Sequence, residues 1–327
     1  MAQKEEPLKI AVVGVGHMGQ YHVNVLSGLT THELVCVYDA DLDRGLEIAS
    51  KYDIPHIQNY AEILEQVEAV VVSVPTEHHF EFAKKALEKG KHVLVEKPIT
   101  VTMEQAKELV EIASEKDLIL QVGHVERFNG AVIELNKIVT EPRYLEAKRV
   151  APFSDRIKDV GVVLDILIHD LDIVLNLVKS RVKSFHAYGS SVFSNNEDVA
   201  TITLYFENGT IANLLGSRIN QNKERLLSVS QDKSTIHLNY ANQDIEIYRQ
   251  ASTAYLMTPD QVKYSQESFV EKLYVHKDNP LRGEHMHFYD CIRNNQTPMV
   301  SNDKDLETLR IAIESLAMIN KQRAQIQ

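Results

Sequence analysis

Residues 8–19 read LKIAVVGVGHMG, an apolar run that ends in a glycine-rich turn. Leu8 to Val15 are mostly branched apolar residues, which is typical of a buried parallel strand. The turn follows the pattern G-x-G-x-x-G with Gly14, Gly16 and Gly19, directly after the strand and at the start of a helix. The first glycine permits a tight turn, the second leaves room for a pyrophosphate, and the third lets helix and strand pack closely. The stretch therefore predicts a dinucleotide-binding unit.

Strand-like and helix-like segments alternate from this stretch to about His124. The expected strands that follow are residues 34–38, 69–74, 91–95 and 118–122, and the expected helices are residues 18–29, 42–52, 79–89 and 103–116. Strands separated by helices at this spacing predict right-handed βαβ units and a parallel sheet with helices on both faces. We therefore expect an α/β domain with a doubly wound Rossmann sheet over residues 1–124.

The pattern changes after His124, where strands begin to alternate between apolar and polar residues. Residues 200–206 alternate in this way, and the Asn208-Gly209 pair that follows predicts a hairpin. Further strands are expected at 225–230, 235–240 and 244–249, and helices at 162–178, 284–294 and 304–322. These elements predict an α+β domain over residues 125–327, built on a large, mostly antiparallel, open-faced sheet. Because helices cover one face of such a sheet, we expect the other face to form a homodimer or homotetramer.

Composition narrows the class of protein. The 327 residues correspond to about two domains, and 44% hydrophobic with 25% charged residues is typical of a globular chain. With 35 Lys and Arg against 46 Asp and Glu, the net charge of −11 argues against nucleic acid as a partner. Two cysteines, Cys36 and Cys291, cannot form a four-ligand zinc site. Without a signal-type or membrane-spanning apolar run, we expect a cytoplasmic protein that does not contact membranes.

The start of the first helix is the expected site of the cofactor pyrophosphate. Backbone amides at a helix N-terminus attract phosphate groups, so we expect Gly14, Gly16, His17, Met18 and Gly19 to contact the cofactor. The alternative is a glycine-rich turn without a ligand.

Asp39 lies 20 residues after Gly19, at the end of the second strand, where a carboxylate binds the adenosine ribose. A carboxylate repels a 2′-phosphate, so NAD is expected rather than NADP, although the nearby Arg44 weakens that preference. Pro75, Thr76 and His79 follow a strand at the same carboxyl edge and are expected to contact the cofactor as well. An ordinary strand-ending turn is the alternative for Pro75 and Thr76, and a surface histidine is the alternative for His79.

Glu96-Lys97-Pro98 follows the strand 91–95 at this edge. A lysine there can stabilise a developing alkoxide or transfer its proton. A Glu-Lys pair on its own is more often a solvated surface pair.

The apolar helix 162–178 contains Asp165, His169 and Asp172 on one face. Asp165 lies one helical turn before His169 and can orient its ring, as a general base requires. One alternative is a structural hydrogen bond between the two side chains. Another is a metal site, but no third ligand follows at a suitable spacing, so no metal is expected.

These motifs, in this order, resemble the glucose–fructose oxidoreductase / inositol dehydrogenase (Gfo/Idh/MocA) family. The resemblance covers essentially the whole chain and includes the runs 123–129 (GHVERFN) and 287–294 (HFYDCIRN). It implies a Rossmann domain with an open-faced α/β domain, and a reacting centre of Lys97, Asp165 and His169. It also implies that Glu96 and Lys97 lie near the nicotinamide ribose and that the Lys97–Pro98 peptide is cis.

Within the family, residues 14–22 and 122–129 are most similar to the sugar-nucleotide branch, with the UDP-N-acetylglucosamine 3-dehydrogenases of lipid A synthesis. This similarity implies oxidation of a secondary ring hydroxyl of a sugar nucleotide, with Arg127, Arg149 and Arg156 as candidate ligands of a diphosphate beside Asp165 and His169. Two alternatives stay open. The chain could oxidise an inositol or another free sugar, or it could be an NAD(H)-sensing protein that catalyses no reaction.

Overall fold

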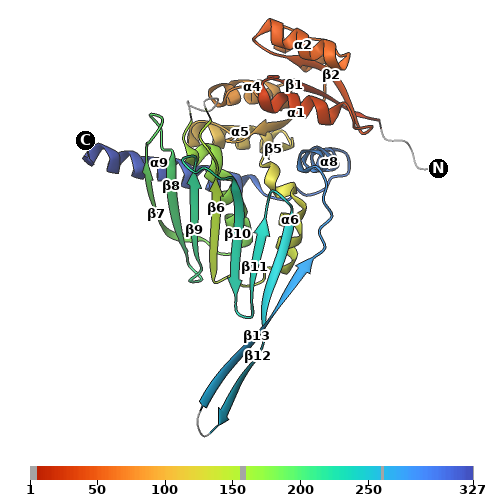
Figure 1. Ribbon diagram of the computed structural model, residues 1–327. Coiled ribbons are helices and arrows are strands. Elements are labelled where there is room, and N and C mark those ends of the chain that lie inside the picture. Colours follow the sequence, from red (N-terminus) through yellow and green to blue (C-terminus); the bar gives the residue numbers. More distant parts are fainter. Residues whose placement is uncertain (1–5, 155–159, 259–260, 327) are drawn as a thin grey trace, which may run out of the picture. The chain divides into compact units, whose positions relative to one another are not determined.

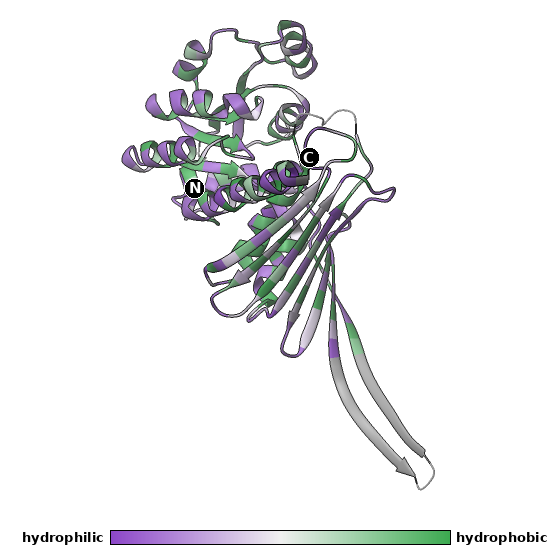
Figure 2. Cartoon of the chain, turned by 90° about the vertical axis from the view of Figure 1, so that its left-hand side faces the viewer, coloured by the Kyte–Doolittle hydropathy of each residue, from purple (hydrophilic) through white to green (hydrophobic). Residues whose placement is uncertain are grey.

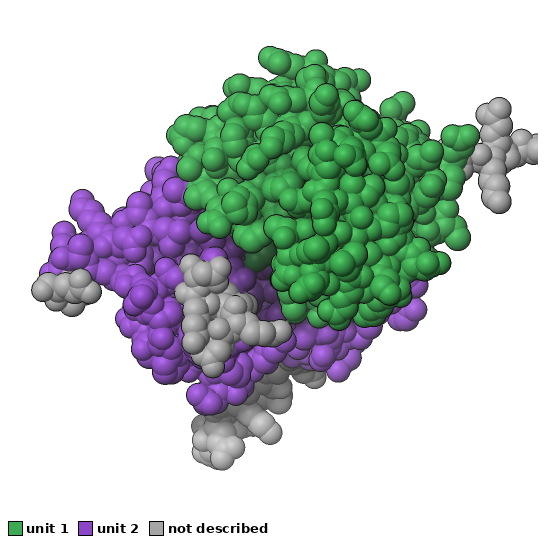
Figure 3. Space-filling view, turned by 90° about the horizontal axis from the view of Figure 1, so that it is seen from above, with its two compact units in different colours: residues 1–128, 279–310 green, residues 129–278, 311–327 purple. Residues whose placement is uncertain are grey.

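The computed structural model describes residues 6–154, 160–258 and 261–326, and over 250–258 and 261–268 it describes the backbone alone. The chain divides into two compact units (Figure 3). Unit 1 comprises Met1–Phe128 and Asn279–Arg310, and unit 2 comprises Asn129–Asp278 and Ile311–Gln327.

Unit 1 contains the predicted parallel sheet. Its strands are β1 (Leu8–Val13), β2 (His32–Tyr38), β3 (Ala69–Val72), β4 (His92–Glu96) and β5 (Leu120–Gly123), in the order β2-β1-β3-β4-β5. Between them lie α1 (His17–Leu26), α2 (Leu42–Tyr52), α3 (Tyr60–Gln66), α4 (Thr76–Glu88) and α5 (Met103–Glu115), and η1 (Val125–Phe128) follows β5. The expected Rossmann architecture is confirmed. The sequence analysis missed α3, a helix of seven residues that begins after an Asn59 cap.

The core of unit 1 includes a helix from the C-terminal third of the chain. This helix, α8 (Pro280–Arg293), buries Phe288 and Tyr289 among the apolar side chains of β1 and α1. The sequence analysis placed the whole of 125–327 in one domain, whereas residues 279–310 belong to the same compact unit as the parallel sheet. The physical reason is the apolar side of α8, which is buried in the core of unit 1 with side chains of β1 and α1.

Unit 2 contains an eight-stranded sheet in the order β13-β12-β11-β10-β6-β9-β8-β7, in which only β6 and β9 are parallel neighbours (Figure 1). The strands are β6 (Tyr144–Val150), β7 (Val182–Ser190), β8 (Val199–Phe206), β9 (Ile211–Ser217), β10 (Glu224–Gln231), β11 (Ser234–Asn239), β12 (Asp244–Thr258) and β13 (Gln261–Leu273). The helices are α6 (Gly130–Ile138), η2 (Val163–Leu167) and α7 (Ile168–Leu177). A further helix, α9 (Asn302–Ile326), begins in unit 1 and continues in unit 2 from Ile311.

The predicted hairpin joins β8 to β9, with Gly209 at a φ of +85°. Asn208 supports the turn by accepting a hydrogen bond from the amide of Thr210. The strand expected at 244–249 continues to Thr258, and beyond Arg249 it pairs only with β13, so that the two strands form an arm beyond the other strands (Figure 1).

The eight-stranded sheet has one buried and one exposed face. Along β8, Ala200, Ile202, Leu204 and Phe206 are buried in the core of unit 2, and the residues between them are exposed. Figure 2 shows apolar and polar residues alternating along these strands. This alternation confirms an open-faced sheet. Among the described residues, no helix combines the length and apolarity needed to span a bilayer.

Candidate active site

The glycine-rich turn has the geometry that a dinucleotide requires. Gly14 has a φ of +87°, and a Cβ atom there would lie 2.7 Å from the backbone of Ser73. A Cβ at Gly19 would overlap the carbonyl oxygen of Gly14, whereas one at Gly16 would meet no atom within 4 Å. Gly16 is also the N-cap of α1, and no described side chain caps this helix. Open space therefore lies over an uncapped helix N-terminus, which suits a pyrophosphate.

The turn lies where the strand order of the sheet reverses. β1 pairs with β2 on one side and with β3 on the other, so the connections leave β1 in opposite directions. Ligands of open parallel sheets bind at the carboxyl ends of the strands at such a point. The residues that open α1, His17 and Met18, are exposed and half-buried, respectively.

Asp39 is buried at the end of β2 and is held by several donors. Its carboxylate accepts hydrogen bonds from the amide of Asp41 at 2.9 Å and from the Arg44 guanidinium at 2.8 and 3.2 Å. Burial acts to raise the pKa of Asp39, but the hydrogen bonds outweigh burial and keep this pKa below its ordinary value. Asp39 therefore loses its proton at a lower pH than an ordinary aspartate, and it lies directly after β2, where the sequence predicts a ribose ligand.

His79 connects two loops at the carboxyl edge of the sheet. Its side chain is 1% exposed, with Nδ1 2.8 Å from the carbonyl oxygen of Pro98 and Nε2 2.9 Å from that of Val74. Both ring nitrogens thus lie against backbone carbonyl oxygens, and a neutral ring donates a hydrogen bond to one of them. Contact of His79 with the cofactor stays a prediction. Pro75 is exposed and Thr76 is half-buried, so those two residues stay available to a ligand.

Lys97 follows β4 in a fixed backbone. The carboxylate of Glu96 accepts a hydrogen bond from the Lys97 amide at 3.2 Å, and the Lys97–Pro98 peptide is cis, as the resemblance implied. Lys97 itself is half-buried. Its backbone is therefore anchored on both sides, by Glu96 before it and by the contact of Pro98 with His79 after it.

A buried polar cluster that the sequence analysis missed surrounds Glu96. His22 of α1 places Nε2 2.9 Å from Glu96 Oε1 and Nδ1 2.9 Å from Nε2 of His285. His22, Glu96 and Glu284 each offer an atom within 4.8 Å of the others. Because both ring nitrogens of His22 already have protein partners, the arrangement fits proton sharing better than metal coordination. The partners lie up to 263 residues apart, and local sequence patterns carry no signal of such a contact.

Glu284 is fully buried, and neither of its carboxyl oxygens has a hydrogen-bond partner among the described residues. Burial raises the pKa of Glu284 well above its ordinary value, and the negative charge of Glu96 raises it further. Glu284 therefore holds its proton to a higher pH than an ordinary glutamate does.

Asp165 and His169 lie in unit 2, at the start of a helix that is not α-helical throughout. The segment η2 is a π-turn, in which the amide of Ile168 bonds to the carbonyl of Val163, five residues earlier. Asp165 lies within this turn, and His169 follows in α7, both half-buried. The expected continuous α-helix is thus wrong over its first turn, so the spacing of the two side chains is set by a wider turn. Single π-turns are frequent at functional sites.

The predicted arginines have protein partners where they are described. Arg149 donates to both carboxylate oxygens of Asp170 at 2.9 Å and stacks over Tyr240 at 4.6 Å. Arg127 donates to Asp305 and is 6% exposed. Because both guanidinium groups are neutralised inside the fold, we do not retain them as diphosphate ligands. Arg156 lies outside the described residues.

Comparison with known proteins agrees with this geometry. The family model described as "Oxidoreductase family, NAD-binding Rossmann fold" matches residues 8–124, and the model of the GFO/IDH/MocA C-terminal domain matches residues 130–239.

Two curated relatives are informative. The chain is 32% identical over 246 residues to the UDP-N-acetylglucosamine 3-dehydrogenase of Acidithiobacillus ferrooxidans, which covers 75% of this chain and 78% of the relative. It is 26% identical over 331 residues to the scyllo-inositol 2-dehydrogenase (NAD(+)) of Bacillus subtilis, covering 94% and 93% of the two chains. A solved structure of the Acidithiobacillus enzyme superposes with a TM-score of 0.88 at 28% identity, over 96% of this chain and 98% of that one.

Proposed function

Because the chain belongs to the Gfo/Idh/MocA family of NAD-binding oxidoreductases, we propose that it oxidises the 3-hydroxyl of UDP-N-acetylglucosamine. The observation that carries the reaction class is the placement of Lys97, in an anchored backbone at the carboxyl edge of a sheet whose glycine turn fits a dinucleotide. The similarity to the Acidithiobacillus enzyme supports the substrate.

NAD, when bound, supplies the hydride acceptor. Gly14, Gly16, Gly19 and Asp39 bind and orient it in this proposal, and Pro75 and Thr76 contact it from the neighbouring loop. In this oxidation the carbon that bears the hydroxyl loses a hydride and the hydroxyl oxygen loses a proton, and we assign that proton to the ring of His169. Lys97 stabilises the negative charge that develops on the substrate oxygen.

Asp165 has a positioning part in this mechanism. Asp165 lies in η2 and His169 follows at the start of α7, and in this proposal the carboxylate orients the imidazole so that the ring can accept a proton. Glu96 acts similarly on Lys97, because its carboxylate fixes the amide of that residue.

The reaction is tested by following NADH formation with UDP-N-acetylglucosamine, UDP-glucuronic acid derivatives, myo-inositol and scyllo-inositol. We expect turnover with the first compound, and a loss of about 10²–10⁴-fold in kcat for Lys97→Ala and for His169→Ala. The exposed residue Glu207, in the turn between β8 and β9, is far in sequence from both residues and provides the control variant Glu207→Ala. Preferred turnover of an inositol would replace the substrate proposed here, in line with the similarity to the Bacillus enzyme. Tight NAD binding without turnover of any compound would favour the alternative of an NAD(H)-sensing protein that catalyses no reaction.

The product would be a 3-keto sugar nucleotide, and a ketone is the group that an aminotransferase requires. We therefore place the chain in the cytoplasm, in the synthesis of lipid A, before an amination step. Conversion of the product to an amino sugar nucleotide by an added aminotransferase would test this order of reactions.

The exposed face of the eight-stranded sheet supports a homo-oligomer. Tyr205 and Ile211 are paired across β8 and β9, and they are 41% and 39% exposed. Leu226 and Tyr248, on β10 and β12, are 37% and 38% exposed. Large apolar side chains at such positions favour a second copy of the sheet as the partner. We expect a dimer or tetramer by light scattering, and dissociation in the variant Ile211→Glu/Leu226→Glu. A monomeric wild-type protein would contradict this assembly.

A further inference from the structure

A glutamate from a distant part of unit 2 caps the helix that carries Asp165 and His169. Glu197 lies in the segment between β7 and β8 and is 3% exposed. Its backbone carbonyl accepts a hydrogen bond from the amide of Val162 at 3.0 Å, and its Oε1 accepts one from the amide of Val163 at 3.0 Å. The first amides of a helix have no partner within the helix, and the residue before η2 supplies no side-chain cap. Glu197 therefore supplies the hydrogen-bond acceptors that a neighbouring N-cap residue normally supplies.

Gly161 makes room for this contact. A Cβ atom on Gly161 would overlap the carboxyl group of Glu197 and no other group is equally close. The carbonyl of Gly161 also accepts a hydrogen bond from the amide of Asp165 at 3.1 Å. Gly161 is thus in contact with the capping carboxylate and hydrogen-bonded to the amide of Asp165.

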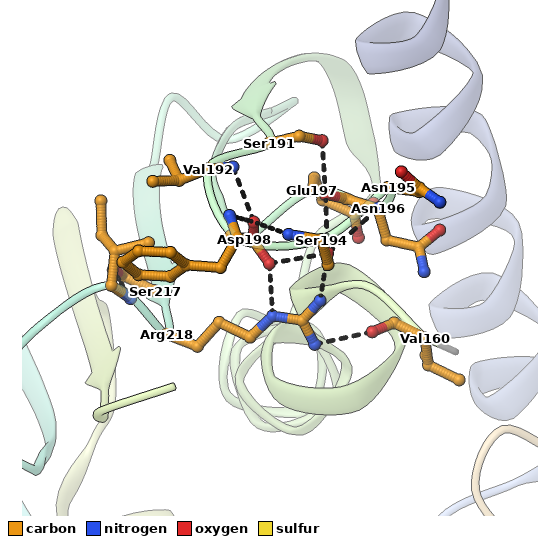
Figure 4. Close-up of polar contacts among 12 residues, drawn as sticks. Val160, Ser191, Val192, Ser194, Asn195, Asn196, Glu197, Asp198, Ser217 and Arg218 are labelled. Carbon is orange, nitrogen blue, oxygen red and sulfur yellow. Dashed lines mark hydrogen bonds and ion pairs between the residues drawn. The ribbon is translucent and has the colours of Figure 1, made fainter. Parts of the chain in front are cut away.

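The segment that carries Glu197 is itself fixed by the next residue. The Oδ2 atom of Asp198 accepts hydrogen bonds from the amides of Val192, Phe193 and Ser194 at 2.7, 2.6 and 3.0 Å (Figure 4). Its Oδ1 atom accepts one from Nε of Arg218 at 2.7 Å. Burial acts to raise the pKa of Asp198, but these hydrogen bonds outweigh it and hold the pKa far below its ordinary value.

Arg218 connects this turn to the start of the helix. Figure 4 shows its guanidinium between Asp198 and the carbonyl of Val160, to which Nη1 donates at 2.8 Å. Val160 immediately precedes Gly161, so the backbone before the helix is held by Arg218 and the first helical amides by Glu197. A carboxylate at this end of the helix also interacts favourably with the helix dipole.

We propose that Glu197 is a positioning residue for Asp165 and His169, and that it acts by holding the N-terminus of the π-turn in place. This inference rests on the catalytic roles proposed above for those two residues. Small displacements of a catalytic group reduce rates strongly, because the reacting atoms must be held close to attack distance.

The test uses four variants: Glu197→Ala, Glu197→Gln, Gly161→Ala and the double variant Gly161→Ala/Glu197→Ala. In Glu197→Ala we expect kcat to fall about tenfold, as the loss of one cap and the resulting displacement suggest, with the Kd for NAD unchanged. The pH profile of kcat should shift as well, since the environment of His169 changes. Glu197→Gln keeps a carbonyl acceptor for Val163 and should retain most of the activity. Glu207→Ala, in the exposed turn between β8 and β9, is the matched control.

The double variant tests whether Gly161 and Glu197 act through the same contact. If Gly161→Ala acts by displacing the carboxylate, it should reproduce the defect of Glu197→Ala, and the double variant should be no worse than either single one. Wild-type kcat in Glu197→Ala, or additive losses in the double variant, would overturn the proposal. Should Glu197→Ala not fold, Gly161→Ala and Glu197→Gln carry the same comparison.

Hydrogen exchange separates this inference from the proposed function. The amide of Val163 should exchange faster in Glu197→Ala and Gly161→Ala than in the wild type, whatever the substrate is. Unchanged protection would refute the cap itself. If the Val163 amide exchanges faster in these variants but the wild type oxidises no tested compound, the capping role of Glu197 is supported and only the assigned reaction is refuted.

Discussion

The carboxylate of Asp39 accepts a hydrogen bond from the backbone amide of Val15 at 2.8 Å, between the end of β2 and the middle of the glycine turn. The residue expected to bind the cofactor ribose therefore also holds the loop expected to bind its pyrophosphate. One side chain thus shapes both halves of the dinucleotide site.

The double role of Asp39 makes its substitution costly. We expect Asp39→Ala to raise the Kd for NAD by about 10–100-fold, since a ribose ligand and a loop contact are lost together. The preference for NAD over NADP should decrease too, because the carboxylate no longer repels a 2′-phosphate and Arg44 is released. Calorimetric titration with both cofactors measures this, with the exposed Asp43→Ala as control. An unchanged Kd for NAD would show that Asp39 is not a cofactor ligand.

Two glycines of the turn should respond differently to the same change. Gly19→Ala places a Cβ against the carbonyl of Gly14, a backbone atom that cannot move away freely, so we expect a loss of about 1–3 kcal/mol in the free energy of unfolding. Gly16→Ala meets no atom within 4 Å and should leave this free energy unchanged within about 0.5 kcal/mol, while weakening NAD binding. Thermal unfolding and NAD titration of both variants distinguish the two effects. Equal unfolding temperatures in the two variants would contradict the geometry.

The buried carboxyl group of Glu284 should make stability depend on pH. Because its pKa is raised in the folded state, the folded protein binds the proton more tightly, and the contribution of Glu284 to stability is fully present below the ordinary value of 4.5. This contribution declines as the pH rises from 4.5 through the raised folded pKa, by up to about 1.4 kcal/mol per pH unit.

Glu284→Gln removes this dependence while keeping the shape of the side chain. Urea unfolding from acidic to alkaline pH should show similar stabilities at low pH and a more stable variant at high pH. The exposed Glu104→Gln should show no such divergence. Parallel curves for Glu284→Gln and the wild type would mean that the pKa of Glu284 is the same in the folded and unfolded states, against the raised pKa described above.

The pair of Arg149 and Asp170 should be structural. Arg149→Leu leaves the Asp170 carboxylate buried without its partner, and we expect a loss of about 3–5 kcal/mol in the free energy of unfolding. In Arg149→Leu/Asp170→Leu no buried charge remains, so the loss should be smaller. Denaturant titration checks both variants. If Arg149→Leu is as stable as the wild type and has a raised KM for UDP-N-acetylglucosamine, Arg149 is a substrate ligand and not a structural residue.

Local patterns determined much of the fold. The strand before Gly14, the hairpin at Asn208-Gly209 and the alternation along β8 follow from turn chemistry and side-chain periodicity, which a few neighbouring residues contain. Asp39 could be placed for the same reason, because its spacing from Gly19 belongs to one βαβ unit. The first turn of the helix carrying Asp165 could not, since a π-turn differs from an α-turn by one residue and has no periodic signature.

Only the tertiary structure determined which residues that are far apart in the sequence come into contact. The sequence alone allowed Arg149 to be a phosphate ligand, but the fold pairs its guanidinium with the carboxylate of Asp170. Glu284, His285 and His22 meet because α8 buries its apolar side against α1 and β1, and Glu197 caps η2 because Asp198 and Arg218 fix its turn. Sequence patterns specify each segment through interactions along the chain. The partners of a buried charge are chosen by how segments pack, because a charge out of water must be paired with whatever group the packing brings to it.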